Sequence, residues 1–346
     1  MTTRRLRLCA ACLSLLVITF ALPVLAGGLG IPTQRAGLGF GNLKDFSGLR
    51  FNLSDRHVNQ VSGLNTTFWI NKDNDFATYH GISLGLIGPV GDEFRGLTVG
   101  LIGVKSGDAQ GITVGGIGME AGNLQGLSIG GIGIGAHDVS GITVGGLGMG
   151  VHDITGVAVG GLGLGGHNVT GVAVGGLGMG VQDITGIAVG GLGLGAADIT
   201  GIAVGGLGMG AQDISGIAVG GLGLGGEDLQ GIFLGGLGVG CESMTGVALG
   251  GLGVGGERLK GLMGGVAGVG AEDITGAAIS VGYLRAEDSF TGLGTGAYTH
   301  TRRTKGLTIG IFNRTDVLEG IQIGLLNYAG NNPSGLRWLP GINAHF

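Results

Sequence analysis

Acidic side chains recur at one position of a 15-residue repeat and are the first candidates for chemistry. If successive repeats stack as parallel strands, neighbouring carboxylates lie about 5 Å apart, and oxygen ligands of this kind suit calcium. We therefore predict a weak, non-specific site for divalent cations along part of this column. The alternative is that Asp and Asn stand there because they hydrogen-bond their own backbone in turns. The column contains Asp138, Asp153, Asp183, Asp198, Asp213 and Asp228, and the predicted metal ligands are Asp183, Asp198, Asp213 and Asp228.

Histidines occupy the preceding column in three successive repeats, at His137, His152 and His167. Imidazole is a common metal ligand, so a stacked row of these side chains could bind a metal ion. The column continues with Gln and Ala, at Gln182 and Ala197. This variation favours an exposed turn position that accepts many residue types over a set of metal ligands. We expect no cofactor other than weakly held calcium.

No catalytic constellation stands out after residue 26. HExxH and CxxC are absent there, and strings that resemble GxGxxG occur by chance in so glycine-rich a chain. Cys241 is the single cysteine outside residues 1–26, and it occupies a column otherwise filled by Ala and Gly. We expect its side chain to be buried, with no internal disulfide, and we predict that the protein is not an enzyme.

The composition excludes several classes of protein. Gly supplies 86 of the 346 residues, charged residues 12% and hydrophobic residues 43%. A disordered chain would carry more charge and fewer aliphatic residues, and the Gly-X-Y period of collagen is absent. The net charge of −5 offers no electrostatic footprint for nucleic acid.

Residues 1–26 have the pattern of a signal peptide. Arg4, Arg5 and Arg7 precede an apolar run from about Leu8 to Leu25, and small residues follow at Ala26 and Gly27. A membrane anchor is the alternative, although the run is short for a span. We predict that the protein is exported to the cell surface, the outer membrane or the periplasm.

One glycine recurs every 15 residues from Gly96 to Gly276, and looser copies from Gly48 to Gly335 bring the total to twenty repeats. Within the repeat from Asp198 to Gln212, large apolar residues follow one another in steps of three and two. Steps of two indicate strands, and glycine in each step of three indicates a corner. We therefore expect all of these side chains to point into one interior. They are Ile199, Ile202, Val204, Leu207 and Met209.

This pattern favours an all-β fold, a β-solenoid of about twenty 15-residue coils whose columns stack on their copies in adjacent coils. The alternative is a 20-stranded transmembrane β-barrel. Barrel strands are apolar outside and polar inside, whereas the segment 201–210 has no polar side chain for either face. Aromatic girdles are also missing, because Phe233 is the single aromatic residue between Phe94 and Tyr283.

The two ends of the repeat region diverge from its centre. We expect residues 27–95 and 291–346 to form capping repeats around a regular array at 96–290, because stacked strand edges invite further addition. Both end segments carry aromatic residues that we expect to act in the caps. They are Phe51, Phe68, Trp69, Phe76 and Tyr79 on one side and Phe312, Tyr328, Trp338 and Phe346 on the other.

The C-terminal repeats also carry a short motif. Gly320-Ile321-Gln322-Ile323-Gly324-Leu325-Leu326-Asn327, followed by Leu339-Pro340-Gly341-Ile342-Asn343, resembles the surface-repeat proteins of spirochaetes and other Gram-negative bacteria, which carry GxQIGLxN units. The segment 306–313 is a second copy. In the central repeats Ala replaces the Gln and GGLG replaces GLxN. The resemblance covers about 40 residues and implies an envelope or surface protein without a known activity.

These observations lead to one expected function and one alternative. We expect an exported envelope or surface protein with a structural or interaction role, and the alternative is an outer-membrane β-barrel that acts as a pore or anchor. The partner is an unidentified surface or envelope component and not nucleic acid. Membrane association and self-association both stay open.

Overall fold

The computed structural model of the chain describes residues 27–70 and 73–346, so the predicted signal peptide at 1–26 lies outside the described residues. The described residues are all-β, with 78% strand and no helix, and form a β-solenoid of about 19 coils. Two compact units divide between Gly161 and Leu162, within the regular array. No helix in the described part of the chain has the length and apolarity needed to cross a membrane.

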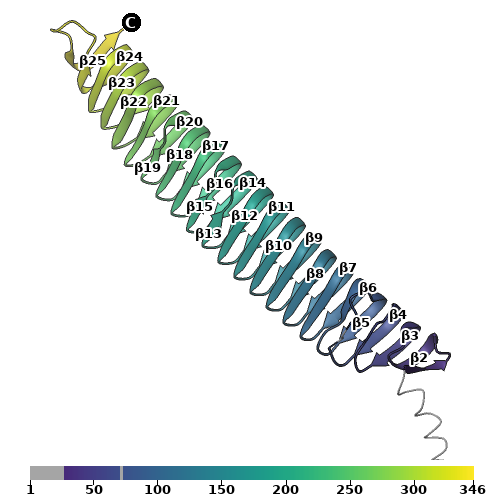
Figure 1. The fold of residues 1–346 in the computed structure, drawn as a ribbon. Coiled ribbons are helices and arrows are strands. Elements are labelled where there is room, and N and C mark those ends of the chain that lie inside the picture. Colours follow the sequence, from purple (N-terminus) through teal and green to yellow (C-terminus); the bar gives the residue numbers. More distant parts are fainter. Residues whose placement is uncertain (1–26, 71–72) are drawn as a thin grey trace, which may run out of the picture. The chain divides into compact units, whose positions relative to one another are not determined.

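The first unit contains strands β1 to β10 (Figure 1). Their bounds are β1 Gly28–Pro32, β2 Ala36–Gly41, β3 Asp45–Asn52, β4 Gln60–Thr67, β5 Thr78–Gly85, β6 Val90–Gly100, β7 Gly103–Gly115, β8 Gly118–Gly130, β9 Gly133–Gly145 and β10 Gly148–Gly160.

The second unit contains strands β11 to β25. Their bounds are β11 Gly163–Gly175, β12 Gly178–Gly190, β13 Gly193–Gly195, β14 Asp198–Gly205, β15 Gly208–Gly210, β16 Asp213–Gly220, β17 Gly223–Gly235, β18 Gly238–Gly250, β19 Gly253–Gly255, β20 Arg258–Gly265, β21 Gly268–Ser280, β22 Tyr283–Thr295, β23 Tyr298–Ile309, β24 Phe312–Ala329 and β25 Trp338–His345.

Successive coils pair in parallel, residue for residue, within each unit. In β14 and β16, for example, Asp198 pairs with Asp213 and Val204 with Val219. The predicted repeat glycine occupies the same paired position in every coil, and at Gly201 its φ is +130°. A Cβ atom there would also collide with the carbonyl oxygen of Gly186, so only glycine fits. Parallel pairing confirms the predicted solenoid, because the barrel alternative requires antiparallel neighbours.

The prediction that five apolar columns point into one interior is wrong for three of them. Ile199 and Met209 are buried, but Ile202 is 40% exposed, Leu207 is 49% exposed and Val204 is half-buried. Strand β14 runs through Gly201 without interruption, so inward and outward side chains keep alternating. A step of three residues, from Ile199 to Ile202, therefore crosses to the outside.

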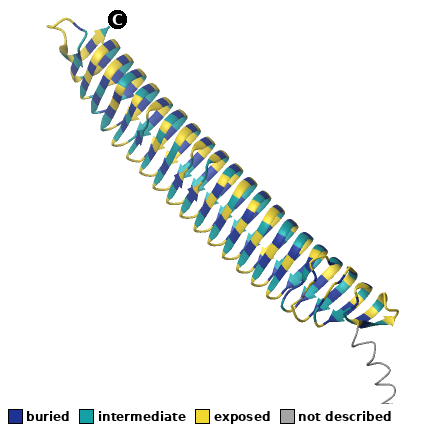
Figure 2. Ribbon diagram, in the orientation of Figure 1, coloured by how far each residue is buried: buried dark blue, intermediate teal, exposed yellow. Residues whose placement is uncertain are grey.

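Alanine takes the place inside that the large aliphatic residues were expected to fill. Ala203 is 0% exposed, and its column includes Ala158 in the first unit and Ala173, Ala188 and Ala218 in the second. The banding of buried and exposed residues along each strand is visible in Figure 2. The core is consequently narrow, and the larger aliphatic side chains that flank the alanine column lie on the outer surface of each coil.

Antiparallel strands cover both ends of the strand ladder. β1 pairs antiparallel with β2, and β25 pairs antiparallel with β24, where Gly341 lies opposite Gly324. Gly335 therefore begins no further coil, and the predicted twentieth repeat is wrong. The predicted role of the aromatic residues in the caps holds for some of them: Trp338 on β25 packs against the rings of Phe312 and Tyr328. Phe76 and Phe346 are almost fully exposed and take no such part.

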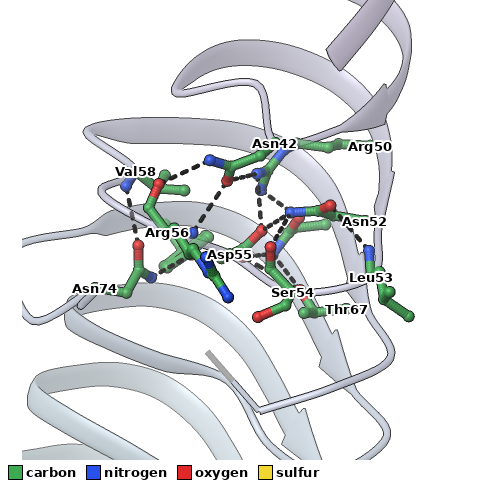
Figure 3. A network of polar contacts seen from close by, with 12 residues as sticks. Asn42, Arg50, Asn52, Leu53, Ser54, Asp55, Arg56, Val58, Thr67 and Asn74 are labelled. Carbon is green, nitrogen blue, oxygen red and sulfur yellow. Dashed lines mark hydrogen bonds and ion pairs between the residues drawn. The ribbon is translucent and has the colours of Figure 1, made fainter. Parts of the chain in front are cut away.

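The core of the first coils combines apolar side chains, such as Phe46 and Val61, with a buried polar cluster. Arg50 on β3 forms a completely buried ion pair with Asp55, at 2.7 Å, and donates a hydrogen bond to the Oδ1 atom of Asn65. Asp55 also accepts hydrogen bonds from the hydroxyl groups of Thr67 and Tyr79. Figure 3 shows Arg50, Asp55 and Thr67 converging within this end of the solenoid.

A second polar ladder fills the last coils and explains the GxQIGLxN motif physically. Gln322 and Asn327 of the motif are buried, whereas Ile323 and Leu325 are exposed. The Asn327 amide accepts a hydrogen bond from Asn313 and donates to the carbonyl oxygens of Leu339 and Gly341 in the covering strand. Asn327 of the motif therefore links β25 to the last coils, whereas the Gln322 side chain donates to Thr315.

Candidate interaction surface

The most extensive feature of the second unit is a surface that we call the outer aliphatic face. It consists of the outward columns represented by Ile202, Val204 and Leu207, which lie on β14 and the turn after it. Each coil contributes a segment of six residues. The segments begin at Val172, Ile187, Ile202, Ile217, Ile232, Val247, Leu262, Ala277, Leu293, Leu307 and Ile321.

The first unit has an equivalent face of its own. Its clearest segments are 82–87, 97–102, 112–117, 127–132 and 142–147. Ile82, Leu101, Ile117 and Leu147 are among the exposed side chains. Beneath these segments the inner column is hydroxylated, with Thr98 and other buried Ser and Thr residues where the second unit has Ala.

Charge is separated from the outer aliphatic face in both units. None of the segments named above contains Asp, Glu, Lys or Arg. The charged residues of the central coils occupy other columns. Asp228 stands in the column of Asp198, Glu242 in that of Gln212, and Lys260 in that of Thr200. Each unit is therefore amphipathic in cross-section.

A hollow of about 300 Å³ interrupts the face of the second unit. Gly264 stands there in the column of Val204, between Leu249 and Ile279 on the neighbouring coils, and Val281 completes the rim. The two flanking side chains are 43% and 49% exposed. The hollow is thus an apolar socket in the aliphatic ridge, and Thr295 interrupts the same column further along the chain.

The predicted metal ligands occupy successive paired positions in the second unit. Asp183 pairs with Asp198, Asp198 with Asp213, and Asp213 with Asp228. The side chains are exposed or half-buried, so water solvates the carboxylates at the edge of the coil. The predicted stacking is confirmed, and binding of a cation to the ladder stays a prediction.

The histidine column brings together ligand atoms of a kind that metals prefer. The rings of His137 and His152 stack with centroids 4.7 Å apart, and His137 Nδ1 lies 3.0 Å from Asp138 Oδ1. Within the described residues, His137, Asp138 and His152 form the one group of three whose ligand atoms all lie within 4.8 Å of one another. These exposed residues could hold a zinc-like ion.

Two serines lie in strings that match GxSxG, the sequence of a nucleophile elbow, at 81–85 and 126–130. Ser83 and Ser128 are buried inside continuous strands, whereas an elbow exposes its serine on a sharp turn between a strand and a helix. Cys241, which was expected to be buried, is half-buried. Burial, followed by the charge of Asp228, raises the pKa of its thiol to about 11, which keeps the thiol protonated and weakly nucleophilic.

Sequence analysis missed the outer aliphatic face, although one signal was present. Ala occupies the column of Ala203 in most central repeats, between two columns of branched residues. Strict alternation across the glycine would have placed this small residue inside and its two large neighbours outside.

No family model, curated protein or solved structure matches this chain.

Proposed function

We propose that this chain is an exported, non-catalytic structural protein of the cell envelope, which acts by packing its outer aliphatic face against an apolar partner surface. The apolar leader-like segment at 1–26 supports export. The partner argued in the next subsection is a second copy of the chain.

The separation of charge from aliphatic side chains carries this proposal. A monomeric soluble protein rarely exposes a contiguous apolar patch larger than about 300–600 Å². Here the outward columns stay aliphatic from coil to coil between residues 172 and 252, with Leu192, Leu207 and Leu222 each about half exposed. Folding alone does not require this, because Ala203 and Ile199 fill the core.

The chemistry-bearing side chains support a binding role rather than catalysis. The Asp and His columns lie on exposed coil edges, and the Cys241 thiol has a pKa raised to about 11 by burial. An activated nucleophile would need a lowered pKa or an adjacent general base.

Cell fractionation with two matched double variants tests the proposal. Leu192→Lys with Leu222→Lys adds two charges to the outer aliphatic face, and Thr185→Lys with Ser215→Lys adds the same charges to an exposed polar column. We expect all three proteins in the exported fractions, where chemical cross-linking should retain the wild-type protein and the polar-column variant, but not the face variant, in a larger complex. Wild-type protein in the cytosol, or equal retention of both variants, would contradict the proposal.

A further inference from the structure

We infer that the occupant of the outer aliphatic face is a second copy of this chain, packed face to face. The inference rests on the proposed function and names its partner. Three properties of the face lead to it, namely its area, its repeating relief and the charge that surrounds it.

The area suits a stable protein interface. Six residues span about 20 Å along a strand, and eleven stacked coils span about 50 Å, so the second unit alone offers a footprint on the order of 1,000 Å². A standard interface buries about 800 Å² on each partner. The five segments of the first unit contribute a further face of the same chemistry.

The relief of the face is complementary to itself. The columns of Val204 and Leu207 form two aliphatic ridges, and Gly206, which is exposed and has no side chain, forms the trough between them. The side chains within each ridge repeat at every coil, about 4.8 Å apart. An identical face has the same spacing, so a leucine ridge of one copy fits the glycine trough of the other. The socket at Gly264 offers a deeper seat for one such side chain.

The surrounding charge favours a second copy over a lipid bilayer. No Lys or Arg occurs between Lys105 and Arg258, whereas this stretch contains eleven Asp and Glu residues. From Arg258 onward the chain carries eight Lys and Arg and six Asp and Glu residues, so the acidic surroundings belong to the segments before residue 258. Proteins that lie on membranes place Lys and Arg beside their apolar face, where they attract anionic lipid. The acidic columns here would instead be repelled by an anionic leaflet, while in a face-to-face pair they remain in water.

Pairing through one surface patch also limits the size of the assembly. A two-fold pair uses the same face of the second unit on both partners, so this face is no longer open to a third copy. The strand edges are already covered by β1 and β25, which opposes end-to-end growth. We therefore expect closed pairs and not open filaments.

Sedimentation equilibrium of the purified protein tests the inference with the same matched variants. The wild-type protein and the Thr185→Lys, Ser215→Lys variant should sediment as dimers. The Leu192→Lys, Leu222→Lys variant should sediment as a monomer, with an association constant at least tenfold smaller. Far-ultraviolet circular dichroism and thermal melting establish that the three proteins are equally folded. A dimer that both variants form equally well would overturn the inference.

Flotation with vesicles of phosphatidylethanolamine and phosphatidylglycerol separates the two proposals. A monomeric wild-type protein that floats with vesicles, and loses this property in the face variant alone, would overturn the second copy but retain the interaction role of the face. A monomeric wild-type protein that does not float with vesicles would contradict both the second copy and the interaction role of the face. Dimers that do not float are the expected result.

Discussion

Asp198 and its partners form an uncompensated row of like charges. Each carboxylate pairs with the same residue type on the next coil, and parallel strands place such positions about 4.8 Å apart. Repulsion between two charges at this distance is on the order of 1 kcal/mol in water. Exposure of the side chains limits the cost, and no Lys or Arg side chain occurs in this stretch of sequence to relieve it.

The double variant Asp198→Asn with Asp213→Asn should be more stable than the wild-type protein. Removing the repulsion should raise the melting temperature by a few degrees at low ionic strength, and 0.5 M salt should shrink the difference. The neutral control is Thr200→Ala with Ser215→Ala, which changes the exposed column two residues after the Asp column in the same two coils. Calcium should raise the wild-type melting temperature more than that of the double variant. If calcium leaves the melting temperature of the wild-type protein unchanged, the prediction that a cation binds the Asp column is wrong.

Cys241 should react slowly with a hydrophilic disulfide reagent at pH 8. Burial raises its pKa from 9.0 to about 11, so little thiolate exists in the folded protein at that pH. Because the unfolded chain releases the proton first, this thiol lowers folding stability as pH rises from about 9 to 11. Guanidinium should speed the reaction at least tenfold, and Cys241→Ala should remove this contribution above pH 9. Equal rates in the folded and unfolded protein would contradict the burial.

At the scale of the strand, the polar core near β3 stabilises one end of the solenoid only while both charges are present. Asp55→Asn should destabilise the protein by about 3 kcal/mol, since it leaves the Arg50 guanidinium buried without its counter-charge. Adding Arg50→Met should recover part of the loss. Urea unfolding gives the free energies, and Asp45→Asn on the exposed start of the same strand is the control. A single Asp55→Asn variant as stable as the wild-type protein would show that water reaches the pair.

The sequence allowed correct prediction of those features of the strands that backbone geometry determines. It did not allow prediction of which side chains pack inside the coil. The positive φ that Gly201 requires leaves a signature in the sequence, and so the period, the strands and the parallel stacking were predicted correctly. Whether Ile202 or Ala203 faces inward depends on whether the strand continues through the glycine. Spacing alone does not show this, and the outer aliphatic face was therefore missed.

At the scale of the whole molecule, stability should be modular. Each coil contacts its neighbours along the ladder, so stability is roughly a sum over coils and their interfaces. Deleting Asp183 to Gln212 joins Gln182 to Asp213 and restores the 15-residue register. This variant should fold with a cooperative melt, whereas a deletion of eight residues from Asp183 should not. Circular dichroism and hydrogen exchange distinguish the two, and an unfolded two-coil deletion would refute the modular account.

The central claim is that the coil turns alanine inward and the large aliphatic residues outward. Thermal unfolding of the two single variants Ile202→Lys and Ala203→Lys tests it most directly. Lysine is introduced at two adjacent positions, of which Ile202 is 40% exposed and Ala203 is 0% exposed. In the monomer, lysine at position 202 can extend into water, so at protein concentrations too low for pairing the melting temperature should change by only a few degrees. Lysine at position 203 would bury a charge without a partner, and that variant should not fold. The opposite order, with the Ile202→Lys variant unfolded and the Ala203→Lys variant stable, would contradict the account.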